Sequence, residues 1–264
     1  MTPVALAIFD IDGVVRDVGG SYRRAIADTV EYFTLGSWRP SLADIDQLKA
    51  EGTWNNDWKA SQELIYRYAN RYGQPIDPNL SYEQIVDFFQ KRYRGPDPDD
   101  PAQWTGYITQ EPLLLSSAYL QSLSQSGMPW GFFSGATRGS AEYVLKNRLG
   151  LTDPVLVAME DAPSKPDPTG LISTVRQIEQ RHPEALGQPV IYAGDTVGDL
   201  QTVAAAAVKF PSRQWIGVGI LPPHAQADAD YQAAYAQKLR DAGAAIVIPQ
   251  VQDLTPERIR SLLG

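Results

Sequence analysis

Short apolar segments alternate with segments of helical periodicity along the C-terminal part of the chain. The alternation predicts strands at 130–134, 154–158, 190–193, 214–219 and 245–248, and helices at 113–126, 139–149, 169–180, 199–206 and from 256 onward. A further apolar run at 5–10 predicts an N-terminal strand. Because strands that alternate with helices form parallel sheets, we expect an α/β fold with a doubly wound parallel sheet.

The region 17–103 has a different character, with helical spacing throughout and no clear strand. Helix starts are indicated at Ser21, Ser41, Asp57 and Ser81, the last with the capping-box partner Gln84. Flexible linkers are expected at 17–20 and 95–101, which are rich in glycine and in proline and acid, respectively. We therefore expect an α/β core of residues 1–16 and 104–264, with an inserted helical domain at 17–103. A helix at 228–241, inside the segment 222–243, has no function assignable from sequence.

Composition narrows the classes of function. The chain has 23 basic and 31 acidic residues, a net charge of −8, which argues against nucleic-acid binding. It has no cysteine and two histidines, so neither a disulfide framework nor a common zinc site is expected. No signal segment or long apolar span is evident, and we expect a soluble, cytoplasmic protein without a membrane partner.

Polar residues follow four of the expected strands. Asp10 and Asp12 follow the first, in the stretch Asp-Ile-Asp-Gly, and Ser134-Gly135 follows the strand at 130–134. Lys165 lies in the loop after 154–158, and the motif Gly-Asp-Thr-Val-Gly-Asp, with Asp195 and Asp199, follows 190–193. In a parallel sheet the carboxyl ends of the strands lie along one edge, where ligands bind. We expect these side chains to converge there.

Each cluster has a simpler explanation when taken alone. Asp12-Gly13 suits a turn, Ser134 suits a helix start, and Asp199 suits a helix cap, whereas most lysines in loops are solvated. The four clusters in this order, each at a strand end, argue against four independent coincidences.

Together the clusters resemble the four motifs of the haloacid dehalogenase (HAD) superfamily, and the insertion resembles the C1 cap of its subfamily I. Closer still, the chain resembles a little-characterised group of HAD hydrolases from cyanobacteria and plants. The resemblance implies a HAD-like Rossmannoid core, Mg²⁺ as cofactor and an aspartyl-phosphate intermediate. It implies the nucleophile Asp10, the general acid and base Asp12, and phosphoryl-binding Ser134, Gly135 and Lys165. The implied metal set is Asp10, the Asp12 carbonyl, Asp195 and Asp199, the last orienting metal-bound water or Lys165.

Substrate contacts outside the core are expected from segment 52–59, which places amides, an acid, a base and two indoles in one loop. Asn56 and Lys59 are the candidates, and plain packing of a small helical domain is the alternative for its aromatic residues. Arg16, Arg23 and Arg138 lie near motif ends, where they would hold a second anionic group or remain solvated.

The leading hypothesis is a Mg²⁺-dependent phosphatase acting on a small phosphorylated metabolite. A mutase related to β-phosphoglucomutase is the runner-up, because it shares this core and cap. A phosphonatase would need a cap lysine such as Lys49 or Lys59. Dehalogenase chemistry is disfavoured, because that branch lacks the second acid of the first motif. A non-catalytic HAD-like binding module ranks well below the enzyme, because no motif residue is missing.

Overall fold

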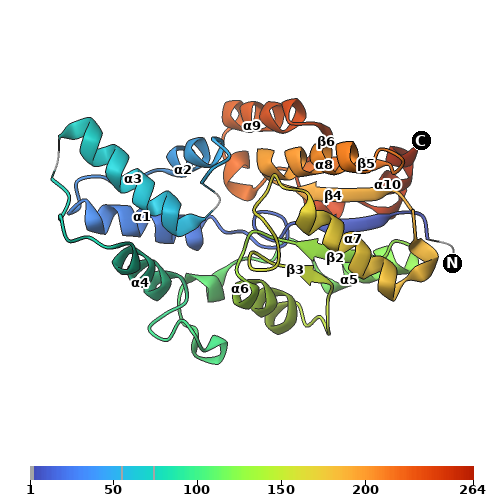
Figure 1. Ribbon diagram of the computed structural model, residues 1–264, viewed down its shortest axis with the longest axis horizontal. Helices are drawn as coiled ribbons and strands as arrows, with labels where there is room; N and C mark the ends of the chain where they lie inside the picture. Colours follow the sequence, from blue (N-terminus) through green and yellow to red (C-terminus); the bar gives the residue numbers. More distant parts are fainter. Residues whose placement is uncertain (1–2, 55, 74) are drawn as a thin grey trace. The chain divides into compact units, whose positions relative to one another are not determined.

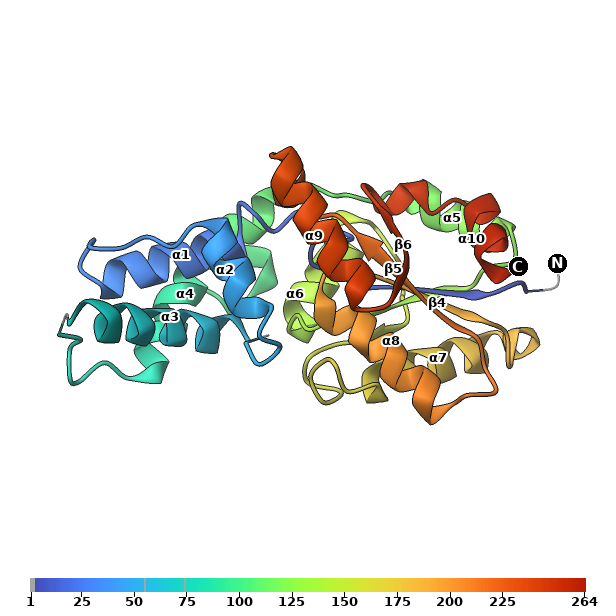
Figure 2. The ribbon, with the colours of Figure 1, turned by 90° about the horizontal axis from the view of Figure 1, so that it is seen from above.

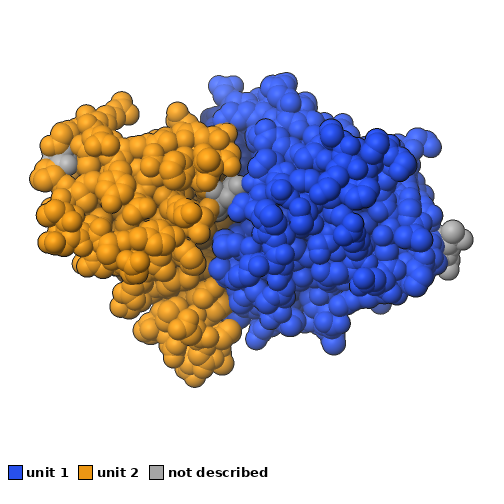
Figure 3. All heavy atoms as spheres, viewed as in Figure 1, with its two compact units in different colours: residues 1–17, 113–264 blue, residues 18–112 orange. Residues whose placement is uncertain are grey.

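The computed structural model describes residues 3–54, 56–73 and 75–264, so Asn55 of the segment 52–59 lies outside the described residues. The chain divides into two compact units, coloured separately in Figure 3. Unit 1 comprises residues 1–17 and 113–264, and unit 2 comprises residues 18–112. No described helix combines the length and the apolar character needed to cross a membrane.

Six parallel strands form the sheet of unit 1 within the described residues, in the order β3-β2-β1-β4-β5-β6 (Figure 1). They are β1 (Leu6–Phe9), β2 (Trp130–Phe133), β3 (Leu156–Val157), β4 (Val190–Gly194), β5 (Trp215–Ile220) and β6 (Ala244–Ile248). The expected doubly wound α/β fold is thus confirmed. The strand order reverses between β1 and β4, which is where ligands bind in sheets of this kind.

Helices cover both faces of this sheet, so its central strands are apolar along their whole length. The helical elements of unit 1 are α5 (Ser117–Gln125), α6 (Arg138–Glu142), η3 (Tyr143–Arg148), α7 (Thr169–Arg181), η4 (Pro183–Ala185), α8 (Val197–Lys209), η5 (Pro223–Gln226), α9 (Ala229–Asp241), η6 (Val251–Asp253) and α10 (Pro256–Leu263). From β1, Ala7 and Phe9 pack with α5, α6 and α10, whereas Leu6 and Ile8 pack with α7 and α8. Figure 2 shows α5 and α10 on one side of the sheet and α7 and α8 on the other.

Several elements of unit 1 differ from their expected bounds, and three of them differ in an informative way. Helix α5 starts at Ser117 instead of residue 113, because Leu114 N–H donates to Val15 O (2.8 Å) and Ser116 Oγ caps the helix. Strand β3 is shorter than expected because Ala158 N–H donates to the Asp161 carboxylate instead of continuing the ladder. The predicted helix at 139–149 is an α-helical turn followed by the π-helix η3.

Unit 2 is helical, with α1 (Tyr22–Phe33), α2 (Leu42–Lys49), α3 (Asp57–Tyr72), α4 (Tyr82–Tyr93), η1 (Pro101–Gln103) and η2 (Tyr107–Gln110). Capping boxes open α2 at Ser41 and α4 at Ser81, whereas the Ser21 hydroxyl donates to Val18 O (3.3 Å) and does not cap α1. The unit extends to residue 112, beyond the expected end at 103, because η2 packs on α1 and α4.

Candidate active site

Two acidic residues stand at the ends of the two central strands. Asp10 follows β1 directly, and its N–H donates to Ala193 O of β4 (2.9 Å). Asp195 follows β4, and its side chain approaches the turn at Gly13 so closely that a Cβ on that glycine would lie 2.1 Å from Asp195 Oδ2. Gly13 also has a φ of +75°, a conformation that costs glycine little. The turn after β1 is thus shaped to leave room for the Asp195 carboxylate.

Lys165 joins two of the predicted site residues. Its Nζ lies 2.9 Å from Asp10 Oδ1 and 2.5 Å from Asp199 Oδ1. All three side chains are less than a tenth exposed. The structure therefore brings together the residues that follow β1, β3 and β4, as expected for the carboxyl edge of a parallel sheet.

Asp199 is fixed by protein donors on both of its oxygens. Oδ2 accepts hydrogen bonds from Thr196 N (2.9 Å) and Thr196 Oγ1 (2.6 Å), completing the capping box that opens α8. Oδ1 accepts from Lys165 Nζ and lies 3.0 Å from the hydroxyl of Tyr192. With these lone pairs engaged, Asp199 suits the orienting role toward Lys165 better than direct metal ligation.

Tyr192 is a site residue that the sequence analysis missed. Its hydroxyl also lies 3.1 Å from Phe133 O, next to Ser134, and Lys165 Nζ lies 5.4 Å from the centre of its ring. Its position in the apolar run of β4 gave no sign of this contact, because its partners come from distant parts of the chain.

The ionisation of this cluster follows from burial and close charges. Burial raises the pKa of Asp10 to about 7, with Asp199 and Asp12 adding to the rise and Lys165 opposing it. For Lys165, burial opposes the charge, but the carboxylates of Asp10 and Asp199 outweigh it and raise the pKa. Burial likewise acts against a charged Asp199, yet Lys165 and Thr196 prevail and lower its pKa. Lys165 thus favours the charged form of both acids. Its effect, together with that of Thr196, outweighs burial at Asp199, whereas burial outweighs it at Asp10.

The acidic residues have a geometry that fits a divalent cation. One oxygen each from Asp10, Asp195 and Asp199 lies within 4.8 Å of the others, and all three residues are buried. Asp10 Oδ1 is buried, and Lys165 Nζ lies 2.9 Å from it in an ion pair. A hard cation such as Mg²⁺, which takes oxygen ligands, would bring a further positive charge to these carboxylates. The donor set therefore fits Mg²⁺, with Asp10 and Asp195 as the available carboxylates.

Asp12, the predicted acid and base, is held by Arg16, four residues further along the chain. Arg16 Nε donates to Asp12 Oδ1 (2.6 Å), and Arg16 O accepts from Gly13 N (2.9 Å). Arg16 is 1% exposed, so the predicted surface role is wrong for this arginine. Its guanidinium instead braces the loop that carries Asp12.

Ser134 and Gly135 follow β2 as expected. Ser134 is 1% exposed, and its Oγ accepts from Ala136 N (3.0 Å), which turns the chain sharply after the strand. A Cβ on Gly135 would meet nothing within 4 Å, so this backbone borders open space.

The residues predicted to contact substrate from the helical insertion belong to unit 2. The Asn56 side-chain oxygen accepts from Trp58 N and Lys59 N, both at 3.0 Å, and so caps α3. Lys59 is exposed. Lys49 is more enclosed, with its Nζ 2.7 Å from Asp57 and 5.1 Å from the centre of the Tyr22 ring. The cluster of polar residues in this segment thus has a local explanation in helix capping.

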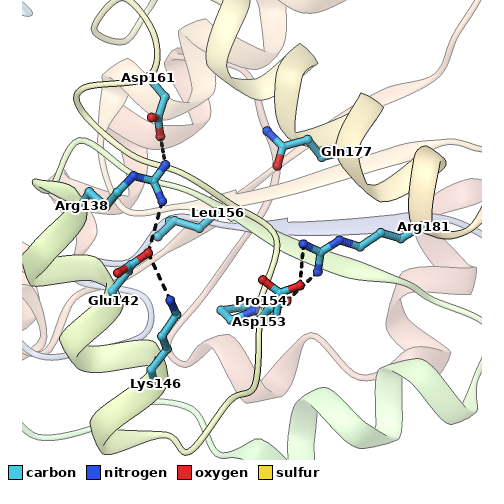
Figure 4. A pocket seen from close by; sticks show the side chains of 9 residues that line it. All are labelled: Arg138, Glu142, Lys146, Asp153, Pro154, Leu156, Asp161, Gln177 and Arg181. Atoms are coloured by element: carbon cyan, nitrogen blue, oxygen red, sulfur yellow. Dashed lines mark hydrogen bonds and ion pairs between the residues drawn. The ribbon is translucent and has the colours of Figure 1, made fainter.

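Arg138 lines a separate cavity of about 300 Å³ beside the edge strand β3 (Figure 4). Its guanidinium pairs with Glu142 and Asp161, and Lys146 and Arg181 pair with Glu142 and Asp153. The cationic groups of this cavity are balanced by carboxylates. It therefore lacks the unbalanced positive charge that a second anionic group would need.

Comparisons with known proteins agree with this geometry. Residues 4–207 match the family of haloacid dehalogenase-like hydrolases. An imidazoleglycerol-phosphate dehydratase from Phytophthora nicotianae is 29% identical over 269 residues, which cover 97% of this chain and 53% of that protein. The chain thus spans about half the length of this curated relative.

Solved structures show the same fold at low identity. A phosphonoacetaldehyde hydrolase-like protein from Oleispira antarctica has a TM-score of 0.65 at 18% identity, covering 98% of this chain and 92% of that one. Phosphatase Tt82 from Thermococcus thioreducens has a TM-score of 0.58 at 21% identity, covering 87% and 98%. At these identities the similarity establishes the fold alone.

Proposed function

The chain belongs to the haloacid dehalogenase-like hydrolase family, and on this premise we propose that it is a Mg²⁺-dependent phosphatase for a small phosphorylated metabolite. The observation that carries the proposal is the buried cluster in which Lys165 lies between Asp10 and Asp199, with Asp195 in reach of the same point. Nucleophile, cation ligands and a fixed positive charge are what phosphoryl transfer requires.

In the first step a carboxylate oxygen of Asp10 attacks phosphorus, and the bond from phosphorus to the ester oxygen breaks. Asp12 gives its proton to the departing alkoxide, so an alcohol leaves and an aspartyl-phosphate remains on Asp10. Lys165, Ser134 and the amide of Gly135 hold the phosphoryl oxygens during the transfer. Bound Mg²⁺, held by Asp10, Asp195 and the Asp12 carbonyl, would neutralise phosphoryl charge.

In the second step water attacks the phosphorus of the aspartyl-phosphate while Asp12 accepts its proton. The bond to Asp10 breaks, which releases inorganic phosphate and restores both carboxyl groups. Asp199 keeps Lys165 in place throughout, since its own oxygens are held by Thr196. The proposed ligand is a small metabolite, in keeping with a charge of −8 that opposes binding to nucleic acid.

The name of the curated relative suggests one class of substrate to test. That protein is named for imidazoleglycerol phosphate, a phosphate ester of a polyol, and this chain matches about half of it. The dehydratase activity in that name is not proposed for this chain. A phosphate ester of a polyol that carries a small ring is nevertheless a reasonable first substrate to test.

The test is release of inorganic phosphate from a panel of phosphate esters that includes imidazoleglycerol phosphate. We expect turnover with Mg²⁺, none with a chelator, and none for Asp10→Asn under either condition. Isomerisation of a sugar phosphate without phosphate release would favour the mutase alternative. A folded protein that releases no phosphate from any ester, with or without Mg²⁺, would contradict the proposal.

A further inference from the structure

The segment 222–243 reaches the acidic cluster through one side chain. The hydroxyl of Tyr235, on α9, donates a hydrogen bond of 3.0 Å to the main-chain oxygen of Asp195. Tyr235 is 8% exposed, and this bond is buried. The helix that had no assignable function from sequence thus contacts the peptide of a proposed cation ligand.

Tyr235 packs in an apolar cluster and against the ring of His224. Helix α9 forms a small apolar cluster with α8, η5 and the residue that follows β5, comprising Leu200, Leu221, Ala225, Tyr235, Ala236 and Leu239. The ring of His224 packs edge-on against the Tyr235 ring, at 6.0 Å between centres and 87° between planes. A hydroxyl on a ring this constrained has little freedom to leave the Asp195 oxygen.

The peptide that receives this bond lies at a critical turn. Asp195 stands between Gly194, the last residue of β4, and Thr196, the cap of α8. Fixing the Asp195 carbonyl fixes the rotation of its backbone, and with it the direction in which the side chain leaves toward Gly13. Partners of this kind, one step removed from a metal, orient its ligands and tune its affinity.

We propose that Tyr235 is a positioning residue that holds the Asp195 carboxylate in the direction required for binding a divalent cation. The inference rests on the proposed function, because it assumes that Asp195 is a cation ligand. It gives the segment 222–243 a role as part of the frame of the metal site.

The test compares two variants that each remove one buried phenol hydroxyl. Tyr235→Phe removes the bond to Asp195 O, and Tyr119→Phe removes an equivalent bond of 2.9 Å to Leu254 O. Mg²⁺ affinity is measured by isothermal titration calorimetry, without substrate. We expect Tyr235→Phe to weaken Mg²⁺ binding about three- to tenfold, and Tyr119→Phe to leave it at the wild-type value.

The outcomes separate this inference from the proposed function. A wild-type protein that binds no Mg²⁺ would overturn both. Wild-type binding with equal affinity in Tyr235→Phe would overturn the positioning role alone, as would an equal loss in Tyr119→Phe, which would indicate general loosening of the fold.

Hydrogen exchange of the wild-type protein gives a second test that needs no variant. Since coupling between two sites is reciprocal, Mg²⁺ should slow exchange in 229–241 as well as in 194–199. Protection of 194–199 with unchanged exchange in 229–241 would count against the proposal.

Discussion

Lys165 Nζ lies 2.9 Å from Asp10 Oδ1 in a buried ion pair, and the same nitrogen lies 2.5 Å from Asp199 Oδ1 in a second one. One ammonium group thus faces two buried carboxylates, so Asp10, Lys165 and Asp199 together carry an excess of one negative charge when both acids are ionised. Burial and this excess of negative charge raise the pKa of Asp10, whereas at Asp199 the opposing effect of burial is outweighed by Lys165 and Thr196, which lower its pKa. We make four predictions from the charges of this cluster and from the groups that hold its side chains in place.

Replacing Lys165 by methionine should be costly for stability. The change leaves two buried carboxylates without their cation, for which we expect a loss of about 3–5 kcal/mol in the free energy of unfolding. Adding Asp199→Asn should restore part of the stability but no phosphatase activity, since Lys165 also contacts the phosphoryl group in the proposed mechanism. Urea unfolding measures the first effect and phosphate release the second. The control is Lys91→Met, which breaks the exposed pair with Asp87 and should cost less than about 1 kcal/mol. Wild-type stability in Lys165→Met would refute the prediction.

Asp10→Asn should stabilise the metal-free protein at alkaline pH. The pKa of Asp10 rises from 3.8 to about 7 on folding, so the native state binds the extra proton and loses stability as the pH rises through 7. Asparagine resembles the protonated form and escapes this loss, by up to about 4 kcal/mol at pH 8. The gain should shrink as the pH falls toward 5.

Thermal unfolding of both proteins in a chelator across this pH range checks the prediction. Asp87→Asn, which alters an exposed carboxylate, is the control and should show no such dependence on pH. A variant that is less stable than the wild type at pH 8 and pH 5 alike would show that burial does not dominate the pKa of Asp10.

Gly13→Ala should impair Mg²⁺ binding through the new methyl group. Its Cβ would lie 2.1 Å from Asp195 Oδ2, so the carboxylate must move. Gly36 has the same φ of +75° but no atom within 4 Å of an added Cβ, which makes Gly36→Ala a control for backbone strain alone. Both variants should lose about 1 kcal/mol of stability from strain, and Gly13→Ala more. Mg²⁺ titration should show at least tenfold weaker binding for Gly13→Ala only; equal affinities in the two variants would be evidence against a role for Asp195 as ligand.

Tyr192→Phe should have a smaller effect on both stability and activity. It removes the hydroxyl that lies near Asp199 Oδ1 and Phe133 O, which should cost about 1–2 kcal/mol. Because Asp199 orients Lys165, we also expect kcat/KM to fall about three- to tenfold, measured on the best substrate of the panel. Tyr119→Phe should match the loss of stability without the loss of activity. If both variants keep wild-type kcat/KM, Tyr192 supports the fold only.

The sequence located the strand ends because parallel strands bring their carboxyl ends to one edge, so Asp10, Lys165 and Asp199 could be expected to meet. It could not locate Tyr192 and Tyr235, since a phenol in an apolar run or on a helix does not reveal a hydrogen-bond partner far away in the chain. For the polar segment around Asn56, substrate contact stays a prediction. The structure shows that the side-chain oxygen of Asn56 caps α3, a role that accounts for this residue locally.

Within unit 1 the chain leaves and returns at one place, where Arg16 pairs with Leu113 in an antiparallel bridge and Leu114 N–H donates to Val15 O. Because the two ends of the insertion lie side by side in unit 1, its replacement by another helical segment would not require unit 1 to change its path. Grafting the corresponding segment of another family member between these two points would therefore leave Asp10, Lys165, Asp195 and Asp199 unchanged in the recipient chain.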